Sequence, residues 1–302
     1  DMLALILILV SAVYFPGVIV KTKAIFSGRK GPGILQPWYD IFRLLKKGSV
    51  YSTSSSFVFQ IGAPIYLATV IVAALFIPFE ENNSIISFSG DFVLFAYLLG
   101  LGRFMIIVSA LDVSSGFEGM GANREAFYSM LMEPAFFILL GSLAMFTGYT
   151  SFHDIFANLH YNSYFSFIIA VIAGYVLANI TLVETSRLPV DDPLTHLELT
   201  MVHEVMVLDH SGFDLGIIKI ANNLKFILFS TLSANCLIPQ SMGLWVRVSV
   251  FLIMQVFFAA GIGWLESFRA RNKMAMNAQY ILSINAVALI LIFVAMIIKN
   301  KI

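Results

Sequence analysis

Apolar residues are gathered into eight long stretches that are separated by shorter polar segments. A helix needs about 20 mostly apolar residues to cross the hydrocarbon core of a bilayer. No run alternates apolar and polar residues in the manner of a transmembrane β-barrel. The pattern predicts an all-α membrane protein with eight transmembrane helices, at residues 2–20, 57–78, 92–111, 126–148, 164–183, 215–238, 244–265 and 278–298.

Basic residues are distributed unequally over the connections between these stretches. The odd-numbered connections hold twelve Lys and Arg residues, the even-numbered connections hold none, and the C-terminal tail holds two. Connections rich in Lys and Arg stay in the cytoplasm. We therefore predict that the odd-numbered connections are cytoplasmic and that both termini lie outside.

Composition supports a membrane protein and excludes several kinds of site. Hydrophobic residues make up 59% of the chain and charged residues only 12%, about half the charged share of a soluble domain. Eighteen basic residues balance eighteen acidic ones, so net charge gives no footprint for nucleic acid. The single cysteine, Cys236, excludes a disulfide framework and a self-contained zinc or iron–sulfur site with cysteine ligands. We expect one polytopic membrane domain over residues 1–302 that binds no cofactor or metal and has no catalytic residue. The first stretch lacks a basic leader and a cleavage site, so we expect it to be a retained helix.

The first connection predicts a basic amphipathic helix. Leu35, Trp38, Ile41, Phe42 and Leu45 recur at helical spacing after a turn rich in glycine and proline, and charged residues occupy the rest of the helical wheel. Such a helix is suited to lie at the membrane surface. One interpretation is lipid anchoring; the other is a lateral helix that borders a binding cavity and docks a cytoplasmic subunit. The docking residues would be Arg29, Gly31, Pro32, Gly33, Gln36 and Asp40.

Ionisable residues at membrane depth mark a pathway or a paired site, because they are costly there. The candidates are Arg103, Glu133, Lys219, Lys225, Arg247 and Glu266. Arg247 and Glu266 lie near segment ends, from which a long side chain can reach the interface. Glu133 precedes Pro134, which frees a backbone carbonyl and favours local polarity. We expect Glu133 either to carry protons or to form a structural ion pair with Arg103.

The third connection, residues 112–125, is rich in glycine but has no nucleotide-binding motif. We expect a flexible polar loop that carries Glu118, Arg124 and Glu125.

The fifth connection is the segment densest in ionisable groups. Glu184 and Arg187 can pair if the helix continues that far, and Asp192 would cap a helix from Pro193 to Leu208. The motif His-Glu-x-x-His is absent, and His196 and His203 would lie about 10 Å apart on one helix, so a metal site is disfavoured. We favour a proton relay, because crowded carboxylates acquire coupled pKa values. Its residues in this connection would be Glu184, Arg187, Asp191, Asp192, Glu198, His203 and Glu204, and Glu133 is the candidate on the fourth span.

Several motifs together resemble one family: subunit 1 of respiratory complex I and the membrane anchors of group 4 NiFe hydrogenases, including formate hydrogenlyase. The matching pieces are Arg29-Lys-Gly-Pro-Gly-Ile-Leu-Gln-Pro-Trp-Tyr-Asp40, Gly121-Ala-Asn-Arg-Glu125, Glu133-Pro134 and Glu184-x-x-Arg-Leu-Pro-x-Asp191. The resemblance implies a non-catalytic membrane subunit whose acidic residues line a water-filled path toward antiporter-like subunits. Glu125 and Glu133 match the family's acidic positions after the third span, and Glu184, Arg187 and Asp191 match those after the fifth, so the resemblance adds Glu125 to the expected proton path.

The chain departs from the family after Arg187. Quinone-using members and formate hydrogenlyase usually continue Arg-x-Pro-Phe-Asp-x-x-Glu-x-Glu-x-Glu-Leu and end in Glu-Tyr-Ser-Gly. This sequence has Val190, Leu194 and His196 at the first three differing positions, keeps Glu198, and ends in Asp209-His210-Ser211-Gly212. These departures favour the hydrogenase-type anchors over a quinone-chamber subunit of an NADH:quinone dehydrogenase, which remains the alternative. A stand-alone ion transporter is less favoured, because no inverted repeat is present.

The resemblance also implies the surroundings of the chain. The expected partners are a hydrogenase-like large subunit, an iron–sulfur small subunit, antiporter-like membrane subunits and lipid, with no nucleic acid. The NiFe centre and the iron–sulfur clusters would lie on those partners. The expected location is the cytoplasmic (inner) membrane of a prokaryote, and the expected role is to link redox chemistry to proton or sodium movement.

Overall fold

The computed structural model describes residues 2–79, 84–159, 163–192, 201–239 and 243–299, and within these ranges it contains helices and no strand. Eight helices are long and apolar enough to cross a membrane. They are α1 (Met2–Phe26), α3 (Phe57–Ala74), α4 (Asp91–Asp112), α5 (Gly116–Thr147), α7 (Ser163–Glu184), α9 (Gly212–Leu237), α10 (Leu244–Phe268) and α11 (Met274–Lys299). Three short helices, α2 (Gln36–Leu45), α6 (Phe152–Leu159) and α8 (His203–Met206), lie between them. The prediction of an all-α protein with eight spans is confirmed.

The eight spans coincide with the predicted stretches. Their ends agree within four residues, except that α5 begins ten residues before the predicted start at 126 and α1 ends six residues after the predicted end at 20. Apolar side chains surround each helix, and a backbone in hydrocarbon must satisfy its own N–H and C=O groups, so each stretch folds as a continuous helix. Proline at positions 16, 64 and 134 lies inside α1, α3 and α5 without ending them.

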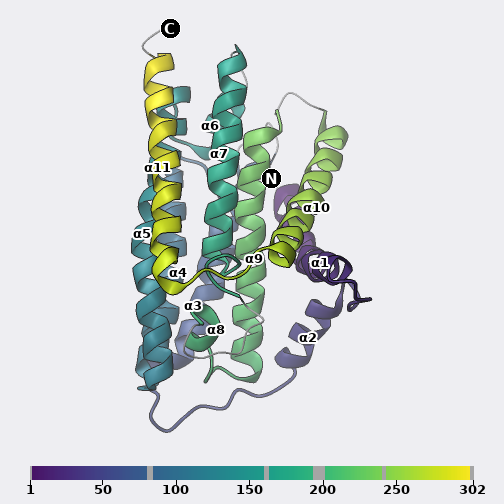
Figure 1. Ribbon diagram of the computed structural model, residues 1–302, viewed down its shortest axis with the longest axis vertical. Helices are drawn as coiled ribbons and strands as arrows, with labels where there is room; N and C mark the ends of the chain where they lie inside the picture. Colours follow the sequence, from purple (N-terminus) through teal and green to yellow (C-terminus); the bar gives the residue numbers. More distant parts are fainter. Residues whose placement is uncertain (1, 80–83, 160–162, 193–200, 240–242, 300–302) are drawn as a thin grey trace.

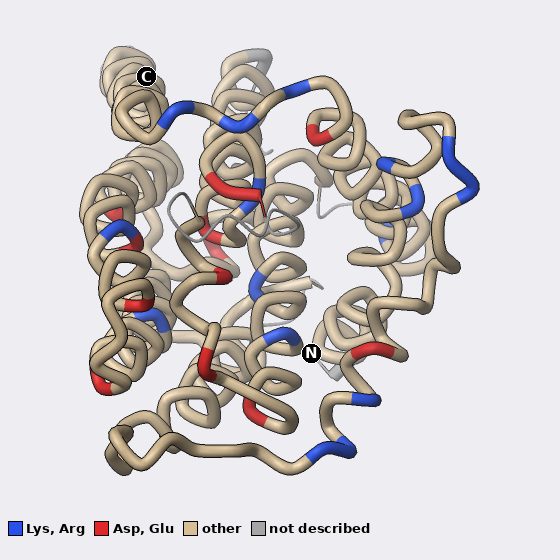
Figure 2. Tube along the Cα trace, turned by 60° about the horizontal axis from the view of Figure 1, so that its bottom comes forward, with Lys and Arg blue, Asp and Glu red and all other residues tan. Residues whose placement is uncertain are grey.

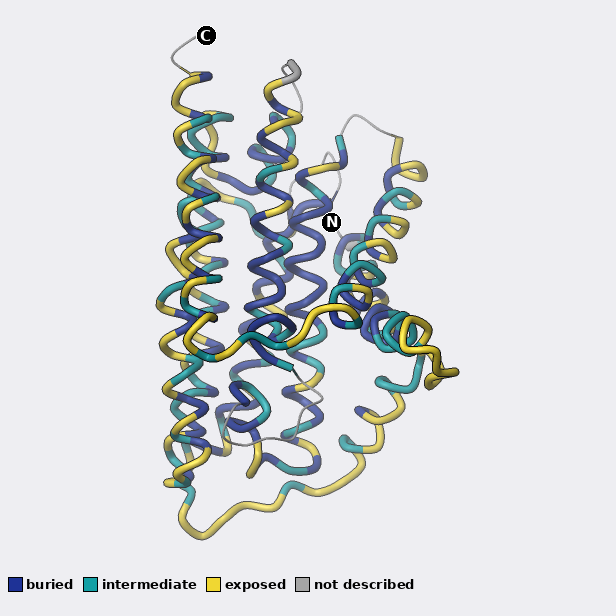
Figure 3. The backbone as a smooth tube through the Cα atoms, in the orientation of Figure 1, coloured by how far each residue is buried: buried dark blue, intermediate teal, exposed yellow. Residues whose placement is uncertain are grey.

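Helix α9 is the centre of the molecule. In its most apolar window 72% of the residues are buried, against 28% in that of α10. It packs against α1, α2, α3, α7 and α10, and Figure 3 shows its upper length as almost continuously buried. In Figure 1, α1, α2 and α10 lie on one side of α9, and α4, α5, α7 and α11 lie on the other. Lys225, Ser230 and Thr231 of α9 are therefore held inside the protein rather than toward lipid.

The amphipathic helix of the first connection is confirmed as α2. Ile41 is buried and Leu45 packs against the core, whereas Phe42 is exposed and lies under the ammonium group of Lys46. Gly17 allows the chain before α2 to approach α1, because a Cβ at that position would overlap the carbonyl oxygen of Ile34.

The expectation of a flexible loop at residues 112–125 is wrong, because helix α5 already begins at Gly116. Gly121 packs directly against α8, where a Cβ would overlap the side chain of Val205 and lie 3.0 Å from the carbonyl oxygen of Val202. Close packing between two helices, rather than flexibility, explains glycine at this position.

The fifth connection does not form the continuous helix predicted from Pro193 to Leu208. Met201 and Val202 are not helical, and α8 covers only His203–Met206. The carboxylate of Asp191 accepts hydrogen bonds from the backbone N–H groups of Val202 and His203, at 3.2 and 3.0 Å. It thereby caps the short helix from outside. The predicted site residues Glu198 and His196, with Pro193 and Leu194, lie outside the described residues.

The fourth connection contains helix α6, which the sequence pattern did not predict. Phe152, Ile155 and Phe156 are buried on its apolar face. The buried carboxylate of Asp91 accepts hydrogen bonds from the backbone N–H of Phe152 and the hydroxyl of Ser151, at 2.8 and 3.0 Å. This side chain ties the start of α4 to the start of α6.

Candidate functional site

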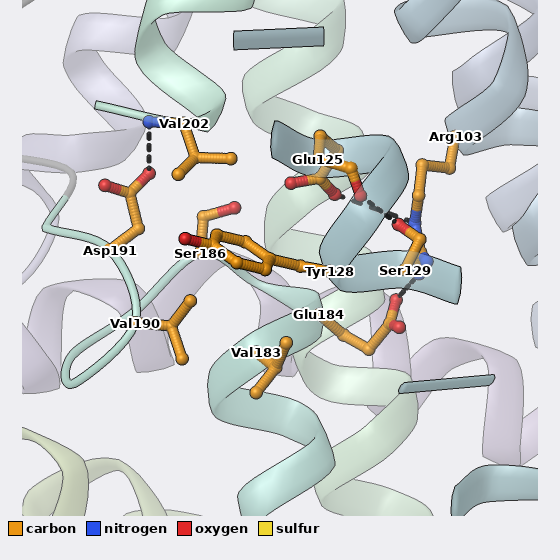
Figure 4. Close-up of a pocket in the computed structure, with 10 residues that line it drawn as sticks. All are labelled: Arg103, Glu125, Tyr128, Ser129, Val183, Glu184, Ser186, Val190, Asp191 and Val202. Atoms are coloured by element: carbon orange, nitrogen blue, oxygen red, sulfur yellow. Dashed lines mark hydrogen bonds and ion pairs between the residues drawn. The ribbon is translucent and has the colours of Figure 1, made fainter. Parts of the chain in front are cut away.

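Four charged side chains from four different helices meet inside the bundle. The guanidinium of Arg103 on α4 forms an ion pair with Glu184 at the end of α7 and lies 3.7 Å from the carboxylate of Glu125 on α5. The ammonium of Lys225 on α9 lies 2.8 Å from the carboxylate of Glu184. Figure 4 shows Arg103 between the two carboxylates. We call these four residues the charge cluster.

The charge cluster is neutral as a whole and shielded from solvent. Its side chains are between 3% and 13% exposed, so water contributes little to their stabilisation. Removing one partner from a buried ion pair costs about 3–5 kcal/mol, because the remaining charge stays buried and uncompensated. The charge cluster avoids that cost, because its two positive and two negative charges share partners. Its electrostatic energy changes when any member gains or loses a proton.

Glu133 does not form the predicted ion pair with Arg103. Within the described part of the chain it makes no ion pair, and it lies on the outer side of α5. It lines a cavity of about 50 Å³ together with Arg103, Glu184 and several aromatic side chains, including Tyr97 and Phe229. A carboxyl group on an outward helix face thus borders a lateral opening toward the charge cluster.

A second group of charges lies where α1, α10 and the fifth connection meet. The carboxylate of Glu266 lies 3.0 Å from the guanidinium of Arg187 and 3.5 Å from the ammonium of Lys23. Lys23 also lies 4.0 Å from the carboxylate of Asp192. The expectation that Glu266 reaches the interface is wrong: its side chain is only 3% exposed and pairs inward.

The predicted pairing of Glu184 with Arg187 is also wrong. Helix α7 ends at Glu184, and Ser186 has a positive φ of 52°, so the two side chains do not share a helical face. Glu184 turns toward the charge cluster, and Arg187 turns toward Glu266. Because α7 ends at Glu184, that residue joins the charge cluster, whereas Arg187 joins the group of charges around Glu266.

Asp191 has a positioning role in addition to its charge. Besides capping α8, it forms an ion pair of 2.9 Å with Arg271, in the connection between α10 and α11. It holds two connections on the same end of the bundle together.

A hydrogen-bonded chain of three side chains adjoins the charge cluster. The hydroxyl of Tyr66 on α3 donates to the amide oxygen of Asn222 on α9 over 2.6 Å. The amide nitrogen of Asn222 lies 2.7 Å from Nε2 of His203 on α8. Tyr66, Asn222 and His203 line a small space together with all four members of the charge cluster.

A larger cavity of about 350 Å³ lies between α1, α2, α9 and the fifth connection. It brings together two sets of residues that the sequence placed apart. Pro32, Gln36 and Asp40 come from the predicted docking set, and Arg187, Asp191, His203 and Glu204 come from the predicted proton path. Arg29, Gly31 and Gly33 are exposed and do not line it. Figure 2 shows acidic and basic residues around this end of the bundle.

Buried polar groups lie around the turn after α8, and the sequence analysis gave none of them a part in the predicted proton path. His210 stacks on the ring of Phe59, with centroids 4.2 Å apart, and burial lowers the pKa of this histidine to about 4, an effect only partly opposed by Asp214. Glu118 is fully buried and accepts a hydrogen bond of 3.0 Å from the backbone N–H of Asp209. These contacts fix the turn between α8 and α9.

Within the described ranges, no group of three or more His, Cys, Asp and Glu side chains is arranged to hold a metal ion. Cys236 is buried in α9. The ionisable side chains of the charge cluster are groups suited to acid–base and electrostatic chemistry.

Comparisons with known proteins agree on one group of relatives. The family model described as NADH dehydrogenase matches residues 1–298. Hydrogenase-4 component C of Escherichia coli is 30% identical over 78% of this chain and 73% of its own length. Formate hydrogenlyase subunit 4 of Escherichia coli is 27% identical over 85% of each chain. An NADH-quinone oxidoreductase subunit of Neisseria meningitidis is 27% identical over 80% of this chain and 70% of its own length. A chain of the membrane-bound sulfane sulfur reductase, an archaeal respiratory membrane complex, superimposes with a TM-score of 0.83 at 19% identity, covering 97% of this chain and 99% of that chain.

Proposed function

Because the chain belongs to the NADH dehydrogenase family of membrane subunits related to complex I subunit 1, we propose that it anchors a cytoplasmic redox arm and couples its chemistry to ion movement. The complex would be hydrogenase-like or hydrogenase-related, and the moved ion would be a proton or sodium. Its partners would be a hydrogenase-like large subunit, an iron–sulfur small subunit and antiporter-like membrane subunits. The chain is a multi-pass membrane protein of a respiratory complex, which we place in the cytoplasmic membrane of a prokaryote with both termini outside.

One observation carries the proposal: the charge cluster lies between two cavities. The 350 Å³ cavity is lined by residues of α1, α2, α9 and the fifth connection, and the 50 Å³ cavity is lined by Glu133 together with Arg103 and Glu184. A change of charge at the first cavity alters the energy of the buried ions, because a low-dielectric interior screens charges weakly. The binding free energy of an ion or proton near Glu133 changes as a result. In this way a reaction at the first cavity would be coupled to ion movement at the second.

The path we propose runs from His203 and Glu204 at the cavity through Glu125 and Glu184 to Glu133. Arg187, Asp191 and Asp192 shape its entrance, and Glu198 belongs to the same segment of the fifth connection. The docking residues of the α1–α2 segment border the entrance, where the cytoplasmic arm would sit. NiFe and iron–sulfur centres would belong to that arm.

A quinone-chamber role is the second candidate, favoured by the similarity to an NADH-quinone oxidoreductase subunit and by the size of the cavity. Small-molecule pockets are lined mainly by apolar and aromatic groups, whereas this wall carries Asp40, Arg187, Asp191 and Lys219. That wall favours water and ions. Quinone found bound at one equivalent per purified complex would favour the second candidate.

The test replaces Glu125 by Gln in the intact complex, which removes a titrating carboxyl group but keeps its size. Electron transfer and ion transport are measured together in sealed inverted vesicles, with Asp154→Asn on α6, away from both cavities, as the matched control. We expect transport to fall severely in Glu125→Gln while the subunits still co-purify. Normal transport in an assembled Glu125→Gln complex would remove the cluster from the coupling path.

A further inference from the structure

The hydrogen-bonded chain of Tyr66, Asn222 and His203 has a fixed direction. An amide oxygen only accepts and an amide nitrogen only donates, so Tyr66 donates to Asn222 and Asn222 donates to Nε2 of His203. Nε2 must then be the unprotonated ring nitrogen, and the proton of the neutral ring lies on Nδ1.

Protonation of His203 is incompatible with that direction. The imidazolium carries N–H groups on both nitrogens, so Nε2–H would face the NH₂ of Asn222 across 2.7 Å. A turn of the amide by 180° resolves the clash, because its oxygen then accepts from Nε2–H. The amide nitrogen then donates to the oxygen of Tyr66, and the hydroxyl hydrogen of Tyr66 must find another acceptor.

The acceptors available to Tyr66 belong to the charge cluster. Arg103, Glu125 and Glu184 all act electrostatically on the Tyr66 phenol, and all line the same space, whose volume of about 10 Å³ suits about one bridging water. Gly102 on α4 makes room for the phenol ring, since a Cβ there would lie 2.9 Å from Cδ2 of Tyr66. Of the two carboxylates, Glu184 is held by two cations, Arg103 and Lys225, whereas Glu125 has only Arg103 as a cationic partner among the charge cluster.

We propose that Tyr66 and Asn222 are positioning residues that report the protonation of His203 at the open cavity to Glu125 in the buried charge cluster. This inference rests on the proposed coupling function and deepens it. One proton moves from cavity water to Nε2 of His203, and no other covalent bond changes at that end. When Glu125 holds a proton in transit along the proposed path, the released Tyr66 hydroxyl donates toward it, stabilises its ionised form and favours departure of that proton toward Glu133. Uptake on one side thereby promotes release on the other.

Charged and titratable groups surround His203 from every element packed around it. They are Asp40 on α2, Tyr66 on α3, Arg103 on α4, Glu125 on α5, Glu184 on α7, Arg187 and Asp191 in the fifth connection, Glu204 on α8, His210 in the following turn, and Lys219 and Lys225 on α9. Both signs of charge are present in similar number around His203.

The chain itself supplies a matched control. The hydroxyl of Tyr280 donates to the amide oxygen of Asn179 over 2.6 Å, as Tyr66 does to Asn222, but the amide nitrogen of Asn179 donates to the backbone oxygen of Tyr175. This second tyrosine–asparagine pair ends at a backbone group that does not titrate. Tyr280→Phe therefore removes the same kind of hydrogen bond as Tyr66→Phe, but it does not interrupt the proposed relay.

The experiment compares Tyr66→Phe, Asn222→Leu and Tyr280→Phe in the assembled complex, with coupled ion transport measured across pH 5 to about 9 to cover histidine titration. We expect Tyr66→Phe and Asn222→Leu to lower transport roughly tenfold, within the usual range of coupling between sites, and to flatten its pH profile. Tyr280→Phe should keep the wild-type profile. Asn222→Asp, which accepts from both neighbours, should move the profile to higher pH, because a carboxylate stabilises the imidazolium.

The outcomes separate this relay from the proposed function. If Glu125→Gln abolishes transport but Tyr66→Phe behaves like Tyr280→Phe, the relay is overturned and the coupling role stands. If Glu125→Gln transports normally, the coupling role itself fails. A reading independent of activity is the ¹⁵N spectrum of histidine-labelled complex, with the His203 signal identified by its loss in His203→Gln. A neutral His203 with its proton on Nε2 would overturn the relay even if the variants fold poorly.

Discussion

Two buried carboxylates in this protein each share their contacts between two cationic partners. Glu184 forms ion pairs with both Arg103 and Lys225. Glu266 forms ion pairs with both Arg187 and Lys23. A carboxylate with two cationic partners gains enough attraction to offset its loss of hydration, which a single exposed pair does not need. A histidine without such a partner responds in the opposite way and loses its proton.

His210 therefore makes stability depend on pH. Its pKa is lowered to about 4 in the folded protein, from 6.5 when unfolded, so the unfolded chain binds more protons between these values. The stabilisation is fully present above pH 6.5 and is lost as the pH falls toward 4, by up to about 3 kcal/mol. His210→Phe, which keeps the stacking on Phe59, should show a smaller drop in the midpoint of thermal unfolding between pH 7 and 4.

The control for this prediction is His153→Phe on α6, which should keep the wild-type pH dependence. A His210→Phe variant whose unfolding midpoint falls with pH as steeply as that of the wild type would contradict the assigned burial of His210.

At the scale of elements, close contact between α5 and α8 positions the fifth connection. Helix α8 has only four residues and no side-chain hydrogen bond at its N-cap. It is held by Asp191 and by the glycine face of α5. His203 is the first residue of α8, so the packing of α5 against α8 determines where His203 lies in the site.

Gly121→Ala tests that contact against a matched position on the same helix. An added Cβ at Gly121 would press on Val202 and Val205, whereas a Cβ at Gly119 would meet nothing within 4 Å. We expect Gly121→Ala to destabilise the protein by about 1–3 kcal/mol and Gly119→Ala to be neutral or stabilising by up to about 1 kcal/mol. Thermal unfolding in detergent measures both. Equal midpoints for the two variants would contradict the packing of α5 on α8.

Sequence patterns predicted some elements well and others poorly, for physical reasons. The spans and α2 follow from hydrophobicity and periodicity, which act locally. Residues 116–125 are rich in glycine and charged residues, so local sequence does not favour a helix there. The segment is helical because it packs against α8, and this contact cannot be read from the local pattern. Likewise Glu266 was assigned to the interface from its place near a segment end, but its partners Arg187 and Lys23 are distant in sequence. Tyr66 and Asn222 carried no signal at all, because each is an ordinary polar residue until the fold brings it to His203.

At the scale of the whole molecule, the direction of the proposed coupling depends on how the protein is oriented in the membrane. The asymmetry of the basic residues predicts that the α2 end lies in the cytoplasm. Single cysteines at Ser52 and Ser89, both exposed, test this in a Cys236→Ala background. An impermeant thiol reagent added to intact cells should label position 89 and not position 52. The reverse pattern would invert the proposed direction of coupling.

Glu133 offers the most direct measurement of the central proposal, that acidic groups of this chain couple electron transfer to ion movement. Because Glu133 makes no ion pair within the described residues and borders the lateral cavity, Glu133→Gln should leave assembly intact. The number of ions moved per electron is measured in sealed vesicles that contain the complete complex. We predict that this ratio falls at least several-fold in Glu133→Gln while the subunits still co-purify. An unchanged ratio in an intact complex would contradict the account.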